Sequence, residues 1–166
     1  MRALLLASLA LSLPLAAAAD EAPIVEHQPV PCMVPGKPMS LCASISDDSK
    51  VASARIYFRA AGEKFFSYVD MFFGGINYCG TVPAVVEGKT KAIEYYVQAV
   101  DDAYQPQRTS TFQMSVQPEG ACDFPPVEKD ASRAASMKVY ATNQKQGKKL
   151  DDAFDGRGVT FVAIAR

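Results

Sequence analysis

The sequence predicts an exported all-β domain, built as a sandwich of two packed antiparallel sheets. The amino-terminal segment has the layout of a signal peptide, the cysteines are even in number, and short strand-like segments recur at roughly ten-residue spacing. Residues 39 to 116 contain no 3.6-residue apolar stripe, and β-branched and aromatic residues dominate the apolar segments. These patterns favour strands over helices.

Residues 1–19 have the pattern of a cleavable signal peptide. Arg2 is the only charge, the apolar run from Ala3 to Leu15 has 13 residues, and small residues at Ala17 and Ala19 precede the expected cut. The alternative, a membrane anchor, would need roughly 20 apolar residues. A lipid anchor would need a cysteine directly after the cut, and the first cysteine is Cys32. We therefore expect a periplasmic or secreted product without a membrane span.

The composition of the mature chain is that of one domain with its own core. Removing 19 of 166 residues leaves 147, and loss of Arg2 from the 17 basic residues leaves 16 against 18 acidic ones, a net charge of −2. This balance gives no indication of a nucleic-acid partner. No motif in the sequence calls for a cofactor.

Turn residues divide the chain into a proline-rich lead-in at 20–38, a sandwich domain at 39–122 and a C-terminal extension at 123–166. The lead-in contains a possible first edge strand near 29–33. The expected strands of the sandwich are 39–46, 53–60, 65–73, 76–82, 91–100 and 109–116. In the extension we expect a possible strand at 137–141, a helical turn at 150–154 and a short closing strand at 158–164.

Three runs, ARIYFRAAGEKFFSYVDM, GGINYCGTVP and KAIEYYVQAVDDAY, resemble the fibronectin type III-like, or immunoglobulin-like, domains of exported bacterial proteins. The resemblance covers about residues 29–117, and residues 93–101 look like the penultimate strand of those domains. It implies an immunoglobulin-like antiparallel β-sandwich. Such domains are usually binding or spacer modules rather than catalysts.

The four cysteines favour two disulfides in an exported chain. Strand alternation places Cys42 and Cys79 on the outer face of one sheet, on strands that are neighbours in this topology, and predicts the bridge Cys42–Cys79. Elimination then pairs Cys32 with Cys122. Free thiols, or bridges to a partner, are the alternative for this second pair. The intervening stretches of 9, 36 and 42 residues contain no C-x-x-C knuckle, so we expect no metal site.

Alternation also predicts a binding face on the outer side of the other sheet. Tyrosine and arginine are the residue types most enriched at binding hot spots, although cross-strand packing is the alternative role for this face. A carbohydrate-binding module that uses Tyr57, Tyr68 and Tyr96 is a further alternative. The residues expected to point outward are Arg55, Tyr57 and Arg59 on the first of three strands, Phe66, Tyr68 and Asp70 on the second, and Glu94, Tyr96 and Gln98 on the third. Of these nine, the candidates for binding are Arg55, Tyr57, Arg59, Tyr68 and Tyr96.

Catalysis is not expected. His27, the single histidine, lies in the lead-in without a nucleophile motif, and a surface position is the simpler interpretation. The acids Asp101-Asp102 and those at 151, 152 and 155 lack the spacing of a calcium loop. Asp70 and Glu94 are expected to pair with Arg55 and Arg59 rather than to act as a glycosidase pair.

The sequence therefore predicts a non-catalytic binding or structural module of the bacterial envelope or of a secreted complex. We expect it to act through protein–protein contact with an envelope or secreted protein.

Overall fold

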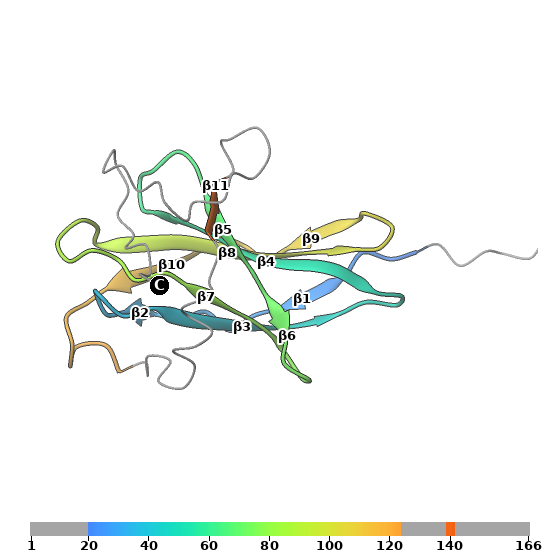
Figure 1. Cartoon of the computed structure of the whole chain (residues 1–166), viewed down its shortest axis with the longest axis horizontal. Coiled ribbons are helices and arrows are strands. Elements are labelled where there is room, and N and C mark those ends of the chain that lie inside the picture. The colour runs from blue at the N-terminus through green and yellow to red at the C-terminus, as the bar shows by residue number, and fades with distance from the viewer. Residues whose placement is uncertain (1–19, 124–138, 142–166) are drawn as a thin grey trace, which may run out of the picture.

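The computed structural model describes residues 20–123 and 139–141, which form an all-β fold of two sheets (Figure 1). The signal-peptide prediction at 1–19 lies outside these residues. The smaller sheet has four antiparallel strands in the order β1-β3-β7-β6. In that order the strands are Ile24–Glu26, Met39–Ser46, Tyr78–Val82 and Phe72–Phe73.

The larger sheet has seven strands, six of them in the order β11-β5-β4-β8-β10-β2, with β9 paired to β8. All of its pairings are antiparallel except the parallel pairing of β10 with β2. In the order of the sheet the strands are Val139–Ala141, Ser67–Asp70, Val51–Ala60, Ala92–Asp101, Phe112–Val116 and Cys32–Met33, with β9 at Pro106–Arg108.

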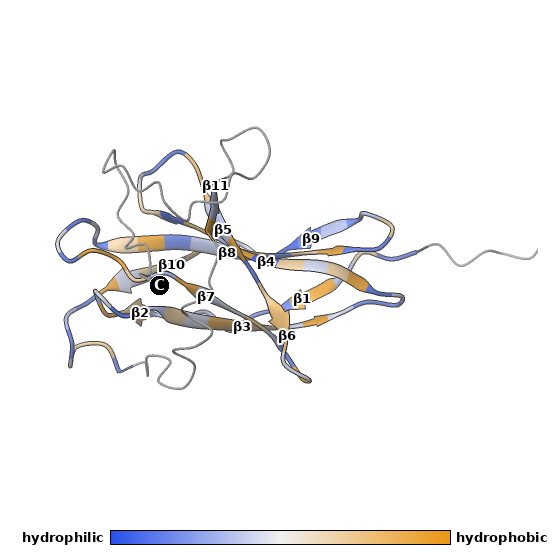
Figure 2. Ribbon diagram, viewed as in Figure 1, coloured by the Kyte–Doolittle hydropathy of each residue, from blue (hydrophilic) through white to orange (hydrophobic). Residues whose placement is uncertain are grey.

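The two sheets lie one over the other, and their inward side chains form a single core (Figure 1). Alternation produces this core because successive residues of a strand point to opposite faces. In β8 every second residue is buried, including Tyr95 and Val97, while the residues between them are partly exposed. Leu41 and Val82 of the smaller sheet are also fully buried in this core. Figure 2 shows the same alternation of apolar and polar residues along the long strands.

The expected single strand at 65–73 is wrong, because the chain changes sheets within it. Residues up to Asp70 pair with β4 in the larger sheet, whereas Phe72–Phe73 pair with β7 in the smaller sheet. Met71 stands between the two strands, and its amide donates to the carbonyl of Ala54 at 2.8 Å. An alternating apolar pattern continues through such a change of sheet, so it does not reveal the break.

Other strand boundaries differ from the prediction by a few residues. The strand expected at 109–116 begins at Phe112, and the one expected at 76–82 begins at Tyr78, which leaves Ile76 exposed in the preceding turn. The short strands β1 and β9 were not predicted, because prolines flank the first and Pro106 begins the second. The strand expected at 137–141 is β11, and the elements expected at 150–154 and 158–164 lie outside the described residues. None of the described residues forms a helix that could cross a membrane.

Both disulfides join the cysteines that the sequence analysis pairs. Cys42 and Cys79 stand directly opposite each other on β3 and β7, with their Cα atoms 4.1 Å apart. Cys32 and Cys122 are joined across 90 positions of the sequence, with Cα atoms 5.8 Å apart. The second bridge connects the lead-in to the segment that follows β10, so it closes an interval that contains all described strands except β1 and β11.

Candidate binding face

A row of four tyrosines crosses the outer face of the larger sheet. Tyr140 of β11 stands opposite Tyr68 of β5, Tyr68 opposite Tyr57 of β4, and Tyr57 opposite Tyr96 of β8. Residues directly opposite on neighbouring strands point to the same face, so four strands bring these rings together. We call Tyr140, Tyr68, Tyr57 and Tyr96 the tyrosine ladder.

The rings of the tyrosine ladder contact one another in a row, and two of the three neighbouring pairs are stacked. The ring centroids of Tyr57 and Tyr96 are 4.8 Å apart with planes 7° from parallel, and those of Tyr68 and Tyr140 are 4.9 Å apart at 15°. Tyr57 and Tyr68 are 5.3 Å apart with a larger tilt of 39°. Tyr57 therefore stands between two rings of the ladder and remains partly exposed.

Two arginines also contact rings of the tyrosine ladder. The guanidinium carbon of Arg55 lies 4.6 Å from the ring centroid of Tyr68, and that of Arg108 lies 4.9 Å from the ring centroid of Tyr96. Such cation–π contacts hold the planar guanidinium against the ring and leave its N–H donors at the rim of the contact. The face therefore presents tyrosine hydroxyls and arginine N–H groups to a partner.

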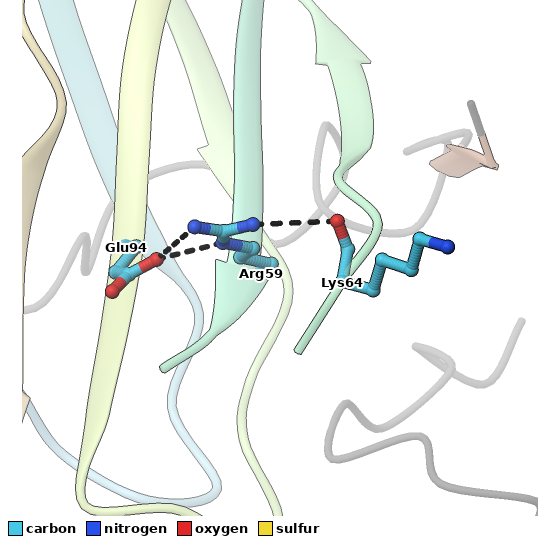
Figure 3. A network of polar contacts seen from close by, with 3 residues as sticks. All are labelled: Arg59, Lys64 and Glu94. Carbon is cyan, nitrogen blue, oxygen red and sulfur yellow. Dashed lines mark hydrogen bonds and ion pairs between the residues drawn. The ribbon is translucent and has the colours of Figure 1, made fainter. Parts of the chain in front are cut away.

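Two ion pairs lie on either side of the tyrosine ladder, as the sequence analysis expects. Arg55 bonds Asp70 through Nε, with the two atoms 3.1 Å apart. Arg59 directs both Nε and Nη2 at one oxygen of Glu94, at 2.7 and 2.6 Å, and its Nη1 donates to the carbonyl of Lys64 at 3.3 Å (Figure 3). The side chains of Arg59 and Glu94 are each about a quarter exposed, at 27% and 26%. These bonds fix the arginine side chains and so preorganise the face.

Burial affects the pKa of two tyrosines and one arginine of the face. Burial raises the pKa of Tyr68 and of Tyr96, since a phenolate loses more hydration than a phenol does. Burial alone would lower the pKa of Arg55, but hydrogen bonds to Tyr57 and Asp70 oppose this effect and leave that pKa raised. Near neutral pH the face therefore combines neutral hydroxyl donors with charged guanidinium groups.

The structure brings together all five residues that the sequence analysis proposes for this face, and it adds two that were not proposed. Tyr140 was missed because it lies in the polar extension, where a three-residue strand has little signal. Arg108 was missed because Pro106 reads as the end of a strand rather than the start of β9. Alternation within the expected strand at 137–141, or within the unpredicted β9, would have been the sequence signal for these residues.

His27 is half-buried at the surface, and its ring is bonded within the protein. Its Nδ1 lies 2.8 Å from the carbonyl oxygen of Cys42, its Nε2 lies 3.0 Å from the hydroxyl of Tyr95, and its ring packs against Phe112. The carbonyl can only accept, so Nδ1 carries the proton and Nε2 accepts from Tyr95. Both ring nitrogens therefore hold the lead-in on the core.

The paired acids at the end of β8, Asp101 in the strand and Asp102 directly after it, also have structural partners. Asp101 is fully buried and accepts the amide of Gln105 at 2.7 Å, whereas Asp102 accepts the hydroxyl of Ser49 at 2.7 Å. Both carboxylates thus join the turns at one end of the sheets. In residues 20–123 and 139–141, no three His, Cys, Asp or Glu side chains are grouped so that they could hold a metal ion. The acids at 151, 152 and 155 lie outside those residues.

Comparisons with known proteins do not assign this chain to a family. No protein-family model matches the sequence, and no curated protein matches it. A solved structure of the SrpA adhesin from Streptococcus sanguinis is similar at 16% identity and a TM-score of 0.42, over 66% of this chain and 63% of the adhesin chain. A mutant of that adhesin is similar at 17% identity and a TM-score of 0.42, over 64% of each chain. The chain thus spans less than two thirds of either adhesin structure.

Proposed function

We propose that this protein is a non-catalytic exported binding module, which contacts an envelope or secreted protein through the tyrosine ladder and its arginines. We further propose that its two sheets form an immunoglobulin-like β-sandwich. The observation that carries the function is the stacked row of four tyrosines flanked by preorganised arginines on one sheet face. Tyrosine supplies a large contact area at low entropic cost, and arginine supplies several hydrogen-bond donors in a fixed planar arrangement.

Two disulfides support the exported part of the proposal. Disulfides persist in oxidising compartments and are rare in the cytosol. The bridges Cys32–Cys122 and Cys42–Cys79 use all four cysteines of the chain. This arrangement suits a periplasmic or secreted protein.

The environment of His27 supports a non-catalytic role. A general base needs a free ring nitrogen within reach of a substrate. Both ring nitrogens of His27 are engaged within the protein, by the carbonyl of Cys42 and the hydroxyl of Tyr95. The one histidine of the sequence therefore holds the fold together and has no nitrogen left for a substrate.

Protein contact suits this face better than carbohydrate binding does. A sugar that stacks on a tyrosine needs an open ring face, because the ring carries its negative potential there. In the tyrosine ladder neighbouring rings cover both faces of Tyr57, and Arg108 lies over Tyr96. A protein partner can instead use the exposed ring edges and hydroxyls.

Site-specific photo-crosslinking in producing cells tests this function. A photoreactive phenylalanine analogue replaces Gln98, which is partly exposed beside the tyrosine ladder, and in the control replaces Thr81 on the outer face of the smaller sheet. We expect one adduct of defined mass from position 98 and none from position 81. The adduct should disappear with Tyr57→Ala/Tyr96→Ala, provided that circular dichroism shows this variant folded.

Other outcomes would reject the proposal. Equal adducts from both positions, or an adduct that survives the double substitution, would mean that the tyrosine ladder only packs the sheet. Absence of any adduct, combined with glycan-array binding that Tyr96→Ala abolishes, would favour the carbohydrate alternative instead.

A further inference from the structure

The turn between β6 and β7 exposes a group of large apolar side chains outside the binding face. Phe72 is 70% exposed, Phe73 is 59% exposed and Ile76 is 87% exposed, and they lie on either side of Gly74 and Gly75. Figure 1 shows this hairpin extending beyond the other strands of the smaller sheet, and Figure 2 shows β6 among the apolar segments. We call Phe72, Phe73 and Ile76 the hairpin tip.

The hairpin tip lies within a stretch without charge. The 16 residues from Met71 to Val86 contain no Asp, Glu, Lys, Arg or His, although the mature chain carries 34 acidic and basic side chains. An ordinary exposed hairpin carries charged or strongly polar residues, because these keep it in water. The hairpin tip lacks that protection.

The apolar side chains surround the hairpin rather than line one flat side of it. Phe72 is opposite Cys79, whose side chain points out of the sheet, and Phe73 is opposite Tyr78 and packs on it with ring centroids 5.1 Å apart. The two phenylalanines therefore point to opposite faces, and Ile76 lies at the turn itself. A flat protein surface could cover only one of these sides, whereas a fluid apolar phase covers all of them.

The size of the hairpin tip also argues against a second copy of the chain as its partner. Three side chains remove on the order of a few hundred Å² from water, whereas a stable interface buries at least about 1,000 Å². A membrane sets no such threshold, because every apolar side chain that enters the interfacial region contributes independently.

The backbone of the turn suits entry into an apolar phase. The amide of Gly74 donates to the carbonyl of Asn77 at 2.8 Å, so this pair of polar groups is satisfied within the hairpin. Gly75 has a φ of 97°, in the left-handed region, which allows the chain to reverse within two glycines. Polar backbone groups that are bonded internally cost less to transfer out of water.

From these observations we infer that the hairpin tip inserts into the interfacial region of a lipid bilayer, and that Phe72, Phe73 and Ile76 anchor the exported protein peripherally at a membrane surface. The interaction depends on apolar contact rather than on lipid charge. This inference does not depend on the tyrosine ladder, which lies on the other sheet.

Tryptophan fluorescence tests the insertion directly, because the sequence contains no tryptophan. The variant Ile76→Trp places one reporter at the hairpin tip, and Tyr104→Trp places a matched reporter at another turn, where Tyr104 is 86% exposed. Both are made in the full mature protein, with removal of residues 1–19 checked by mass spectrometry. The probes are vesicles of phosphatidylcholine, with and without one third phosphatidylglycerol.

We expect a blue shift and quenching by brominated lipid for Ile76→Trp and neither change for Tyr104→Trp. Vesicle co-flotation of the tryptophan-free protein should fall about tenfold for each phenylalanine replaced by serine, and similarly for Ile76→Ser. Co-flotation of the unsubstituted protein should be the same with both lipid mixtures and at salt concentrations of about 50 and about 500 mM, because the hairpin tip is uncharged.

Three results would overturn the inference. The first is an unshifted Ile76→Trp spectrum with both vesicle types. The second is binding that requires phosphatidylglycerol at low salt and survives Ile76→Ser. The third is a concentration-dependent blue shift without vesicles, accompanied by dimerisation in sedimentation, which would assign the hairpin tip to a second copy of the chain.

Discussion

The hydroxyl of Tyr95, at the centre of β8, bonds the imidazole of His27 in the lead-in, with the oxygen 3.0 Å from Nε2. The same oxygen accepts the buried amide of Val30 at 2.8 Å. One buried hydroxyl thus forms hydrogen bonds with two residues, His27 and Val30, of a proline-rich segment whose strands β1 and β2 are short. The lead-in is held on the core by this hydroxyl, by its strand pairings and by the Cys32–Cys122 bridge.

The variant Tyr95→Phe should unfold more easily than the parent protein. Loss of the hydroxyl leaves the amide of Val30 buried without its acceptor, at a cost of about 1–3 kcal/mol in the free energy of unfolding. Urea denaturation followed by circular dichroism measures this change, and Tyr104→Phe on the exposed turn is the control. Equal stability of the two variants would show that the hydroxyl of Tyr95 contributes little.

Stability should fall as the pH decreases below the ordinary pKa of histidine. Burial lowers the pKa of His27 below 6.5, although the bond to the carbonyl of Cys42 partly opposes the effect. The unfolded chain therefore binds a proton more readily than the folded one, so the stabilisation is complete above pH 6.5 and is lost as the pH falls through the lowered pKa. Urea midpoints between pH 8 and 5 should show this decline, and His27→Gln should flatten it.

Substitution of Gly80 should destabilise the protein more than substitution of Gly74. A Cβ atom at position 80 would lie 2.7 Å from Cδ1 of Ile56 and 3.1 Å from the carbonyl oxygen of Asp70, where the two sheets approach. We expect Gly80→Ala to cost about 1–3 kcal/mol. At Gly74 the nearest atom to the added Cβ is the carbonyl oxygen of Asn77, at 3.5 Å, so Gly74→Ala is the control in thermal unfolding. A near-neutral Gly80→Ala would mean that Ile56 adopts another rotamer.

Removing a ring from the middle of the tyrosine ladder should cost more than removing one from its end. Tyr57 contacts two rings of the ladder, whereas Tyr140 contacts one. Each aromatic pair contributes about 0.5–1.5 kcal/mol beyond the area that it buries. The free energy of unfolding should therefore fall about 1 kcal/mol further for Tyr57→Ala than for Tyr140→Ala. The reverse order would show that β11 contributes to stability mainly through other contacts.

The two disulfides should be reduced in a definite order. In the bridge Cys42–Cys79, Cys42 is exposed and Cys79 is partly exposed, whereas in the bridge Cys32–Cys122, Cys122 is partly exposed and Cys32 is only 5% exposed. Thiol exchange requires access to a sulfur atom, so reductant should open Cys42–Cys79 first. Titration with phosphine, alkylation and peptide mass spectrometry gives the order. Labelling of Cys32 before Cys42 would contradict this expectation.

Prediction from the sequence worked best for long strands in which apolar and polar residues alternate regularly. Strand β3 runs over the predicted residues 39–46, and alternation alone oriented Cys42 and the outward residues of β4 and β8. The pairing of Arg55 with Asp70 and of Arg59 with Glu94 also followed, because residues on one face of neighbouring strands are within reach of each other.

The remaining features depend on contacts between segments that are distant in the sequence. The tyrosine ladder includes Tyr140 because β11 pairs with β5, and no local pattern indicates that pairing. The role of His27 depends on a hydroxyl 68 positions away in the sequence. The exposed position of Ile76 results from the start of β7 at Tyr78, which leaves Ile76 in the turn.

The bridge between Cys32 and Cys122 also determines how the protein would respond to mechanical tension. A force that pulls on the two ends of the chain would pass through this covalent bond. The bond closes an interval of 90 positions, and strands β3 to β10 within that interval would therefore bear none of the force. Among the strands of residues 20–123 and 139–141, only β1 and β11, of three residues each, lie outside the closed interval and could be pulled off the sheets. A partner held by the central strands would stay attached to a domain that resists extension from its ends.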